Sequence, residues 1–340
     1  MTASQLSLFE GAPDGRKPNP VQPAEVPPYL AEVAAALPEN LHLGTSSWSF
    51  PGWAGFVYRR SHSPQTLSRH GLDAYARHPL LTGVGLDRTH YRPMTAEALA
   101  AMAEAVPENF RFVVKAHEDS TVRVFPEHPR YGTRRGETNP RFLDPAYATD
   151  QIVQPFVEGL GEKGGVLLFQ LAPQEMAGDF IDRLHDFLRR LPSGPRYAVE
   201  LRNRELLGPP WAEALADAGT LHCLNLHPRM PDVGTQARLS GALEGKALVI
   251  RWMLQSHLTY GDARRRYQPY TRLMDEDPTA RRTVAALATN ALGAGKRVFT
   301  IANNKAEGSA PHTLFELART IARLRAAQTD RKRGPKAPGS

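Results

Sequence analysis

Short apolar runs alternate with longer amphipathic stretches along most of the chain. Each run is followed by a polar or Gly-containing loop and then by a stretch rich in Ala, Leu and Arg. This alternation is typical of β/α units. The apolar runs predict eight strands, at residues 41–43, 84–86, 110–114, 166–171, 197–201, 221–226, 247–252 and 298–301.

Helical patterns lie between most of these runs, and the length that remains without the two ends suits a closed barrel. The predicted fold class is α/β, a single (β/α)8 TIM-type barrel with disordered N- and C-terminal ends. An open doubly wound sheet is the alternative, but no G-x-G-x-x-G follows the first strand and no P-loop occurs, which weakens it. The clearest helical patterns are at residues 95–106, 180–191, 211–218, 280–292 and 314–324.

Composition divides the chain into three parts. Residues 1–28 are rich in Pro, Gly and Asn, so we expect a flexible leader there. The barrel domain is predicted to span residues 41–325. Residues 328–340 contain the basic run RKRGPK and are expected to be a disordered, solvated tail.

The overall composition narrows the class of protein. The chain has 340 residues, of which 41% are hydrophobic and 23% charged, as in a soluble globular protein. It has no apolar run of membrane length and no signal-peptide pattern, so we expect a cytoplasmic protein without a membrane partner. The lone Cys223 excludes an internal disulfide, and its apolar strand favours a buried, inert thiol over a nucleophile.

A TIM-type barrel places functional side chains at the carboxyl ends of its strands. The residues found there are unusually polar. Some of them are expected to cap strand ends, but so many charged and amide groups around one mouth indicate a binding or catalytic site. These residues are Ser46, Ser47, Trp48, Asp87, Thr89, Tyr91, Lys115, His117, Glu118, Gln170, Glu200, Arg202, Asn225, His227, Arg251, Asn303 and Asn304.

Six short sequence motifs lie at or near these strand ends, and their combination is informative. They are GTSSWSF at 44–50, T-x-YR at 89–92, FRFVVKAH at 110–117, LLFQLAP at 167–173, AVELRN at 198–203 and ANN at 302–304. Over residues 41 to 325 this combination resembles the YecE-like family, which is labelled a domain of unknown function. The resemblance implies a TIM-type barrel, grouped by similarity with sugar isomerases and endonuclease-type barrels. It implies no established reaction.

Two elements depart from the family pattern. The family's second strand usually reads V-E-I-N-[ST]-T-F-Y, whereas this chain has Gly85 for the Glu, Asp87 for the Asn and His90 for the Phe. Any role of that Glu is therefore missing or met differently here. The family's Arg-His-Pro after the fifth strand is Arg202-Asn203-Arg204 in this chain, which removes a candidate ligand histidine.

Glu200 and Lys115 are the candidate catalytic residues. Glu200 ends the fifth strand with Arg202 on the same face, so it suits acid or base chemistry, and a structural Glu–Arg pair is the alternative. Lys115 suits binding of a phosphate or carboxylate, which we favour over Schiff-base chemistry. The candidate substrate-binding residues are Trp48, Asp87, Tyr91, His117, Gln170, Arg202, Arg251, Asn303 and Asn304.

The sequence leaves the cofactor open. Asp87, His117, Glu118, Glu200 and His227 could supply ligands to a divalent metal, but no HxH or HExxH spacing supports this. We therefore do not favour a metal and assign no metal ligand.

Basic residues gather in the loops after the third and seventh strands of a chain whose net charge is +7. Cations bind phosphates and aromatic faces stack on bases or sugars, so these loops suit a nucleotide, a phosphosugar or a nucleic-acid strand. For residues 264–267 the alternative is a short amphipathic helix with a solvated basic face. The loops contain Arg123, Arg130, Arg134, Arg135 and Arg141 with Phe125 and Tyr131, and Arg251, Arg264, Arg265, Arg266 and Arg272 with Trp252, Tyr260, Tyr267 and Tyr270.

The leader contains one distinctive peptide, Gln5-Leu6-Ser7-Leu8-Phe9. It resembles the bacterial sliding-clamp-binding motif Gln-Leu-[Ser/Asp]-Leu-Phe. In that interpretation Leu8 and Phe9 enter an apolar pocket of the clamp and Gln5 makes polar contacts, so the partner-binding residues are Gln5, Leu6, Leu8 and Phe9. The alternative is a segment that folds back to plug the bottom of the barrel.

Together these features favour an enzyme that acts on a phosphate-bearing substrate and is recruited to sites of replication or repair. A non-catalytic barrel that binds nucleic acid or nucleotides is the second hypothesis. The third is a sugar or sugar-phosphate isomerase or hydrolase with no connection to DNA.

Overall fold

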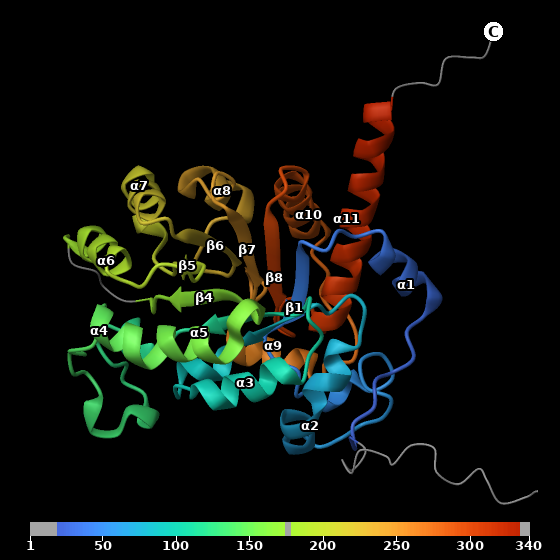
Figure 1. Ribbon diagram of the computed structural model, residues 1–340, viewed down its shortest axis with the longest axis horizontal. Helices are drawn as coiled ribbons and strands as arrows, with labels where there is room; N and C mark the ends of the chain where they lie inside the picture. Colours follow the sequence, from blue (N-terminus) through green and yellow to red (C-terminus); the bar gives the residue numbers. More distant parts are fainter. Residues whose placement is uncertain (1–18, 174–177, 334–340) are drawn as a thin grey trace, which may run out of the picture.

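The computed structural model of the protein describes residues 19–173 and 178–333. Within these residues the strands are all parallel and close into a barrel in chain order, β1 to β8 (Figure 1). All eight predicted strands and the TIM-barrel fold are confirmed. The strands are β1 Leu41–Thr45, β2 Gly83–Leu86, β3 Arg111–Lys115, β4 Gly164–Gln170, β5 Tyr197–Glu200, β6 Leu221–Leu226, β7 Ala247–Trp252 and β8 Arg297–Ala302.

Helices pack around the outside of the barrel, and the five helical patterns in the sequence all correspond to helices (Figure 1). The last helix, α11, packs against β1 and β8, and its carboxyl end projects beyond the barrel. The helices are α1 Pro28–Ala35, α2 Pro64–Ala76, α3 Ala96–Glu104, α4 Pro145–Ala148, α5 Gln154–Leu160, α6 Phe180–Arg189, α7 Pro209–Asp217, α8 Val233–Ser240, α9 Tyr260–Tyr267, α10 Pro278–Gly293 and α11 Ala310–Arg333.

The barrel interior is filled by one apolar cluster separate from the larger core between the strands and the helices. Because alternate residues of a strand point to opposite faces, the inward positions repeat every two residues. On β3, Val113 points into the cluster and Lys115 follows it at the mouth. On β5, Ala198 is followed in the same way by Glu200. The interior cluster consists of Val113, Val166, Leu168, Ala198, Leu221, Cys223, Ala247, Val249, Phe299 and Ile301.

β1 and β2 approach each other through glycines. Gly44 of the GTSSWSF motif pairs with Gly83, and a Cβ at Gly44 would lie 2.2 Å from the Gly83 carbonyl oxygen. No side chain fits at this distance. The glycine that begins the motif therefore sets the spacing of two strands that end at the mouth.

The packed part of the chain begins before the boundary predicted at residue 28. Val21 is 1% exposed, and Pro23 forms a β-bridge with Tyr58. A single apolar residue among prolines carries no periodic signal, which is why this segment resembles a flexible leader in the sequence. The peptide at residues 5–9 lies outside the described residues.

The barrel domain also continues past the boundary predicted at residue 325. Helix α11 extends to Arg333, so it includes part of the segment expected to be a disordered tail. Basic residues are favoured in the last turns of a helix, so a Lys- and Arg-rich end does not by itself break one.

None of the helices within residues 19–173 and 178–333 is both long enough and apolar enough to cross a membrane.

Substituting Gly44 with Ala tests the role of this glycine. We expect Gly44→Ala to lower the free energy of unfolding by about 1–3 kcal/mol, because the new methyl group must displace the β2 backbone. Chemical denaturation measures the change. As a control, Gly293→Ala adds a methyl group at the exposed end of α10, where no atom lies within 4 Å, and should be neutral or stabilising. Equal stability of Gly44→Ala and wild type would contradict the close approach.

Candidate active site at the barrel mouth

Arg251 lies at the centre of the mouth and joins four strands. It is 1% exposed, and its guanidinium binds the side chain that follows β2 and the last residues of β4 and β5. Nη2 donates to both carboxylate oxygens of Asp87, at 2.8 and 3.0 Å, while Nη1 donates to Gln170 at 3.0 Å and to Glu200 at 2.5 Å. Burial would lower the pKa of Arg251, but the charges of Asp87 and Glu200 raise it, so this cation is permanent.

Glu200 is fully buried and binds an arginine through each carboxylate oxygen. Oε2 accepts from Arg251, and Oε1 forms an ion pair with Arg202. Burial would raise the pKa of Glu200, but the charges of Arg202 and Arg251 outweigh it and lower the pKa to about 2. Glu200 is therefore ionised at neutral pH and is a weak base, which favours the alternative role of holding the two arginines.

The side chain of Arg202 is held in place through contacts that lead to α8. Its Nη1 donates to Asn225 Oδ1 at 3.2 Å, and Gln236 of α8 forms hydrogen bonds with both the backbone N–H and the carbonyl of Asn225. Because Asn225 is held on both sides, the guanidinium of Arg202 has a fixed place beside Glu200.

Lys115 differs from these residues because its ammonium group has no direct partner. The residue is 8% exposed, and within the described residues no hydrogen bond or ion pair involves its Nζ. Burial lowers the pKa of Lys115 to about 8, and the charge of Asp87 only partly opposes this effect. The backbone is held in place, since Thr89 Oγ1 lies 2.6 Å from the Lys115 carbonyl oxygen. The structure thus keeps a buried, unpaired ammonium at the mouth.

Asn303 and Lys305 complete the mouth on the side of β8. Asn303 Nδ2 donates to Ser46 Oγ at 2.8 Å, which links the ends of β8 and β1. Lys305 is 5% exposed, and its Nζ lies 3.3 Å from Asn303 Oδ1 and 4.1 Å from the ring centroid of Tyr260. Lys305 is not among the residues predicted from the sequence, although it directly follows the ANN motif.

Two exposed tyrosines rise from the loops around the mouth. Tyr91, after β2, is 62% exposed, and Tyr260, at the start of α9, is 63% exposed. Each has a cation over its ring, Arg130 at 4.7 Å from the Tyr91 centroid and Lys305 over Tyr260. Burial raises the pKa of Tyr91. Both rings offer surface on which a planar group can stack.

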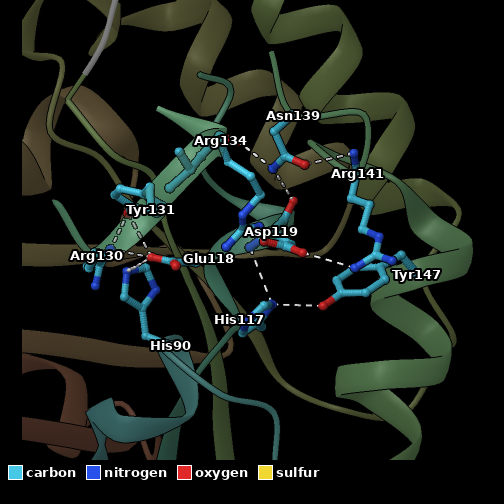
Figure 2. Close-up of polar contacts among 11 residues, drawn as sticks. His90, His117, Glu118, Asp119, Arg130, Tyr131, Arg134, Asn139, Arg141 and Tyr147 are labelled. Atoms are coloured by element: carbon cyan, nitrogen blue, oxygen red, sulfur yellow. Dashed lines mark hydrogen bonds and ion pairs between the residues drawn. The ribbon is translucent and has the colours of Figure 1, made fainter. Parts of the chain in front are cut away.

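The basic loop after β3 pairs its arginines with acidic residues of the same loop, as Figure 2 shows. Arg130 binds Glu118, while Arg134 and Arg141 bind the two oxygens of Asp119. The loop therefore has less unbalanced positive charge than its composition suggests. Three of the five arginines that the sequence suggested for phosphate binding serve at least partly to hold this loop together.

His117 belongs to the same loop. Its Nδ1 lies 2.8 Å from the Tyr147 hydroxyl and accepts a hydrogen bond from the Asp119 N–H (Figure 2). Burial lowers its pKa, so His117 is neutral at pH 7. His90, on the neighbouring loop, lies 3.7 Å from Glu118. The contact between His90 and Glu118 links the β2 and β3 loops.

Residues 260–267 form an amphipathic helix, so the alternative predicted for this segment is correct. Ala263 and Tyr267 of α9 are buried, while Arg264, Arg265 and Arg266 are exposed. Arg265 pairs with Asp262 and Arg266 with Asp275.

Trp48 and Asn304, two candidate substrate-binding residues, are deeply buried. Trp48 donates its indole N–H to the Leu67 carbonyl and borders a cavity of about 260 Å³ that Ser46 and Asp87 also line. Asn304 accepts hydrogen bonds from the Trp53 indole and from the Ala310 N–H at the start of α11. Trp48 thus forms a wall beside the mouth, whereas Asn304 connects helix and loop.

No group of three or more His, Cys, Asp or Glu side chains that could hold a metal ion occurs in the part of the chain that the structure describes.

The sequence matches the family described as "Protein of unknown function DUF72" over residues 42–338. Similar solved structures include a DUF72 family protein from Enterococcus faecalis V583, with 18% identity, a TM-score of 0.58, and coverage of 83% of this chain and 95% of that chain. Another is a DUF72 family protein from Thermotoga maritima MSB8, with 18% identity, a TM-score of 0.57, and coverage of 83% and 98%. At this identity, the two structures support the fold alone. No curated protein matches the chain.

Replacing Lys115 with Met should stabilise the protein. Because folding lowers the pKa of Lys115 to about 8, the buried charge costs stability below pH 8, and this cost disappears as pH rises toward the unfolded-state pKa. We expect Lys115→Met to raise the free energy of unfolding at pH 7 by on the order of 2–3 kcal/mol, with a much smaller gain at pH 10. Urea denaturation at both pH values measures this. A loss of stability at pH 7 would show instead that Lys115 is a structural cation.

Proposed function

The chain belongs to the DUF72 family, whose description names no reaction, and we propose from the geometry of its own mouth that it is an enzyme acting on a phosphate-bearing substrate. The observation that carries this proposal is the unpaired ammonium of Lys115. Four cationic side chains, Lys115, Arg202, Arg251 and Lys305, stand against the two carboxylates of Asp87 and Glu200. Two positive charges thus remain for a ligand, and a phosphate group supplies the matching negative charge.

In this proposal Lys115 binds a phosphate oxygen and transfers a proton. Its pKa of about 8 leaves the amine mostly protonated at neutral pH but close enough to its pKa to exchange a proton with substrate. Glu200, the sequence's candidate for acid or base chemistry, instead holds Arg202 and Arg251 in position. The arginines then present fixed donors to the charge that develops on the substrate.

The exposed tyrosines favour a nucleotide or single-stranded nucleic acid over a phosphosugar. Tyr91 follows Asp87 after β2, Tyr260 begins α9 after β7, the strand that contains Arg251, and both tyrosines have exposed ring surface. Aromatic faces beside a cationic groove suit bases attached to phosphates. A phosphosugar would use the cations and leave the rings unused.

The leader sequence supports a second, separate proposal about where in the cell the protein acts. We propose that residues 5–9 bind a sliding clamp, which would place the enzyme on DNA in the cytoplasm. The support is the match of Gln5, Leu6, Leu8 and Phe9 to the motif. The motif lies ten positions before Asn19, whose side chain donates a hydrogen bond to the His70 carbonyl of α2.

Binding of labelled single-stranded DNA tests the charge of the mouth. By fluorescence anisotropy, we expect affinity that falls with salt and becomes roughly tenfold weaker between pH 7 and pH 9, because Lys115 loses its charge over that range. Lys115→Gln should bind weakly at both pH values, and the exposed control Arg282→Gln should behave as wild type. Failure to bind at low salt would favour the sugar isomerase or hydrolase hypothesis.

Lys115→Arg separates catalysis from binding. Arginine keeps the positive charge but cannot release a proton at neutral pH. On a panel of nucleotides and oligonucleotides we expect this variant to bind within a few-fold of wild type and to turn over about 10²-fold to 10⁴-fold more slowly. Tight binding without turnover by wild type would support a non-catalytic binding barrel.

A pull-down with a sliding clamp tests the leader. We expect the intact chain to bind and the double variant Leu8→Ala, Phe9→Ala to lose binding, because these two residues fill the apolar pocket. Glu10→Ala lies just outside the motif and serves as the control. Equal retention of both variants, or no retention of wild type, would remove the proposal.

A further inference from the structure

Three arginines enter the barrel from three sides at the end opposite to the mouth. Arg111 begins β3, Arg196 directly precedes β5 and Arg297 begins β8. All three occupy inward-facing positions, since Val113, Ala198 and Phe299 follow them two residues later in the interior cluster.

The ring of Phe299, inside the barrel, packs next to this group of arginines. The Arg196 guanidinium carbon lies 5.9 Å from the Phe299 ring centroid, and the His42 ring stacks on Phe299 at 5.1 Å. Gly165 lies next to both Phe299 and Arg111. A Cβ added at Gly165 would lie 2.9 Å from the Phe299 ring and 3.1 Å from Arg111 Cβ. Arg196 therefore lies against the Phe299 ring and Arg111 lies near it, while the charge of Arg297 acts on both of these arginines.

No carboxylate in the described residues binds these arginines directly. In residues 19–173 and 178–333, none of the three arginines forms an ion pair, and the side chain of Arg297 makes no hydrogen bond. The charge of Glu162 acts to raise the pKa of both Arg111 and Arg196, and that of Glu108 acts on Arg111, but Glu108 pairs with Lys163. Burial and then the charge of Arg297 lower the pKa of Arg111, as expected for neighbouring cations.

Many of the donors in this group are unused. Arg196 donates one N–H to the Gly165 carbonyl, at 2.8 Å. Arg111 donates to two carbonyls through Nη1, and its buried Nε has no hydrogen-bond partner. The Nδ1 of His42, a residue 4% exposed, also has no hydrogen bond. Burial and the charges of Arg111 and Arg297 lower the pKa of His42 to about 4, so its ring is neutral at pH 7.

We propose that the amino-terminal end of the barrel binds a phosphate-class oxyanion, inorganic phosphate or a phosphomonoester, between Arg111, Arg196 and Arg297. Three guanidinium groups converging from three strands match the several oxygens and the double negative charge of phosphate better than the two oxygens of a carboxylate. The site shares no residue with the mouth and is independent of the function proposed there.

Isothermal titration with inorganic phosphate, at constant ionic strength against chloride, tests this site. We expect the full-length chain to show saturable binding that weakens at least about tenfold in Arg297→Gln and in Arg196→Gln. Lys115→Gln, altered only at the mouth, should keep this binding event. Affinity unchanged in both arginine variants, or no saturable binding by wild type, would overturn the proposal.

Thermal unfolding separates a ligand site from a structural cluster. In chloride, Arg297→Gln should be at least as stable as wild type, because it removes repulsion between like charges. Phosphate should then raise the melting temperature of wild type more than that of the variant. If Arg297→Gln fails to fold, Arg297→Lys, which keeps the charge but not the planar donors, should fold and bind phosphate more weakly. Equal phosphate stabilisation of wild type and the folded variant would contradict the site.

Discussion

The guanidinium of Arg251 is the interaction on which the rest of the mouth depends. It binds Asp87, Gln170 and Glu200 at once, so the ends of β2, β4, β5 and β7 meet at one buried cation. A buried ion network of this kind is weak evidence for stability, because the desolvation of each charge offsets most of the attraction. What the network does provide is geometry. Four strand ends that diverge from the barrel are held at fixed distances around a polar centre.

That geometry explains why two neighbouring ionisable groups behave so differently. Glu200 has an arginine on each oxygen and remains ionised far below neutral pH. Lys115 stands beside the same arginines without a partner, so its charged form is disfavoured. The carboxylates of Asp87 and Glu200 are thus paired within the network, and the positive charge of Lys115 remains unpaired at the mouth. At the other end of the barrel the imbalance is simpler, since no carboxylate pairs with the three arginines around Phe299 in the described residues.

The alternation of apolar runs with helical stretches was enough to predict the fold, and the carboxyl ends of the predicted strands supplied many of the side chains at the mouth. The structure adds the period of two along each strand. It places Lys115, Glu200 and Arg251 inward because they continue the interior positions of their strands. The same pattern cannot say which side chains meet across the barrel. Asp87 and Arg251 are 164 residues apart, and only the closed ring brings them together.

Interactions within loops were equally hard to predict, because a loop has no period. Glu118 and Asp119 begin the β3 loop, and the arginines that neutralise them follow 12 to 22 residues later. Composition alone made that loop appear to be a phosphate-binding surface. Lys305 was missed for a related reason: it lies in the turn beyond β8, where strand alternation no longer indicates direction.

Cys223 makes opening of the barrel interior measurable through the chemistry of its thiol. It is the one cysteine in the sequence, is 0% exposed, and packs in the interior cluster among residues from β3 to β8. Burial also raises the pKa of its thiol, which suppresses the reactive thiolate. A thiol reagent can therefore modify the native chain only when the strands separate. The rate of labelling of the unaltered protein reads out barrel opening directly, with no engineered probe and no competing site.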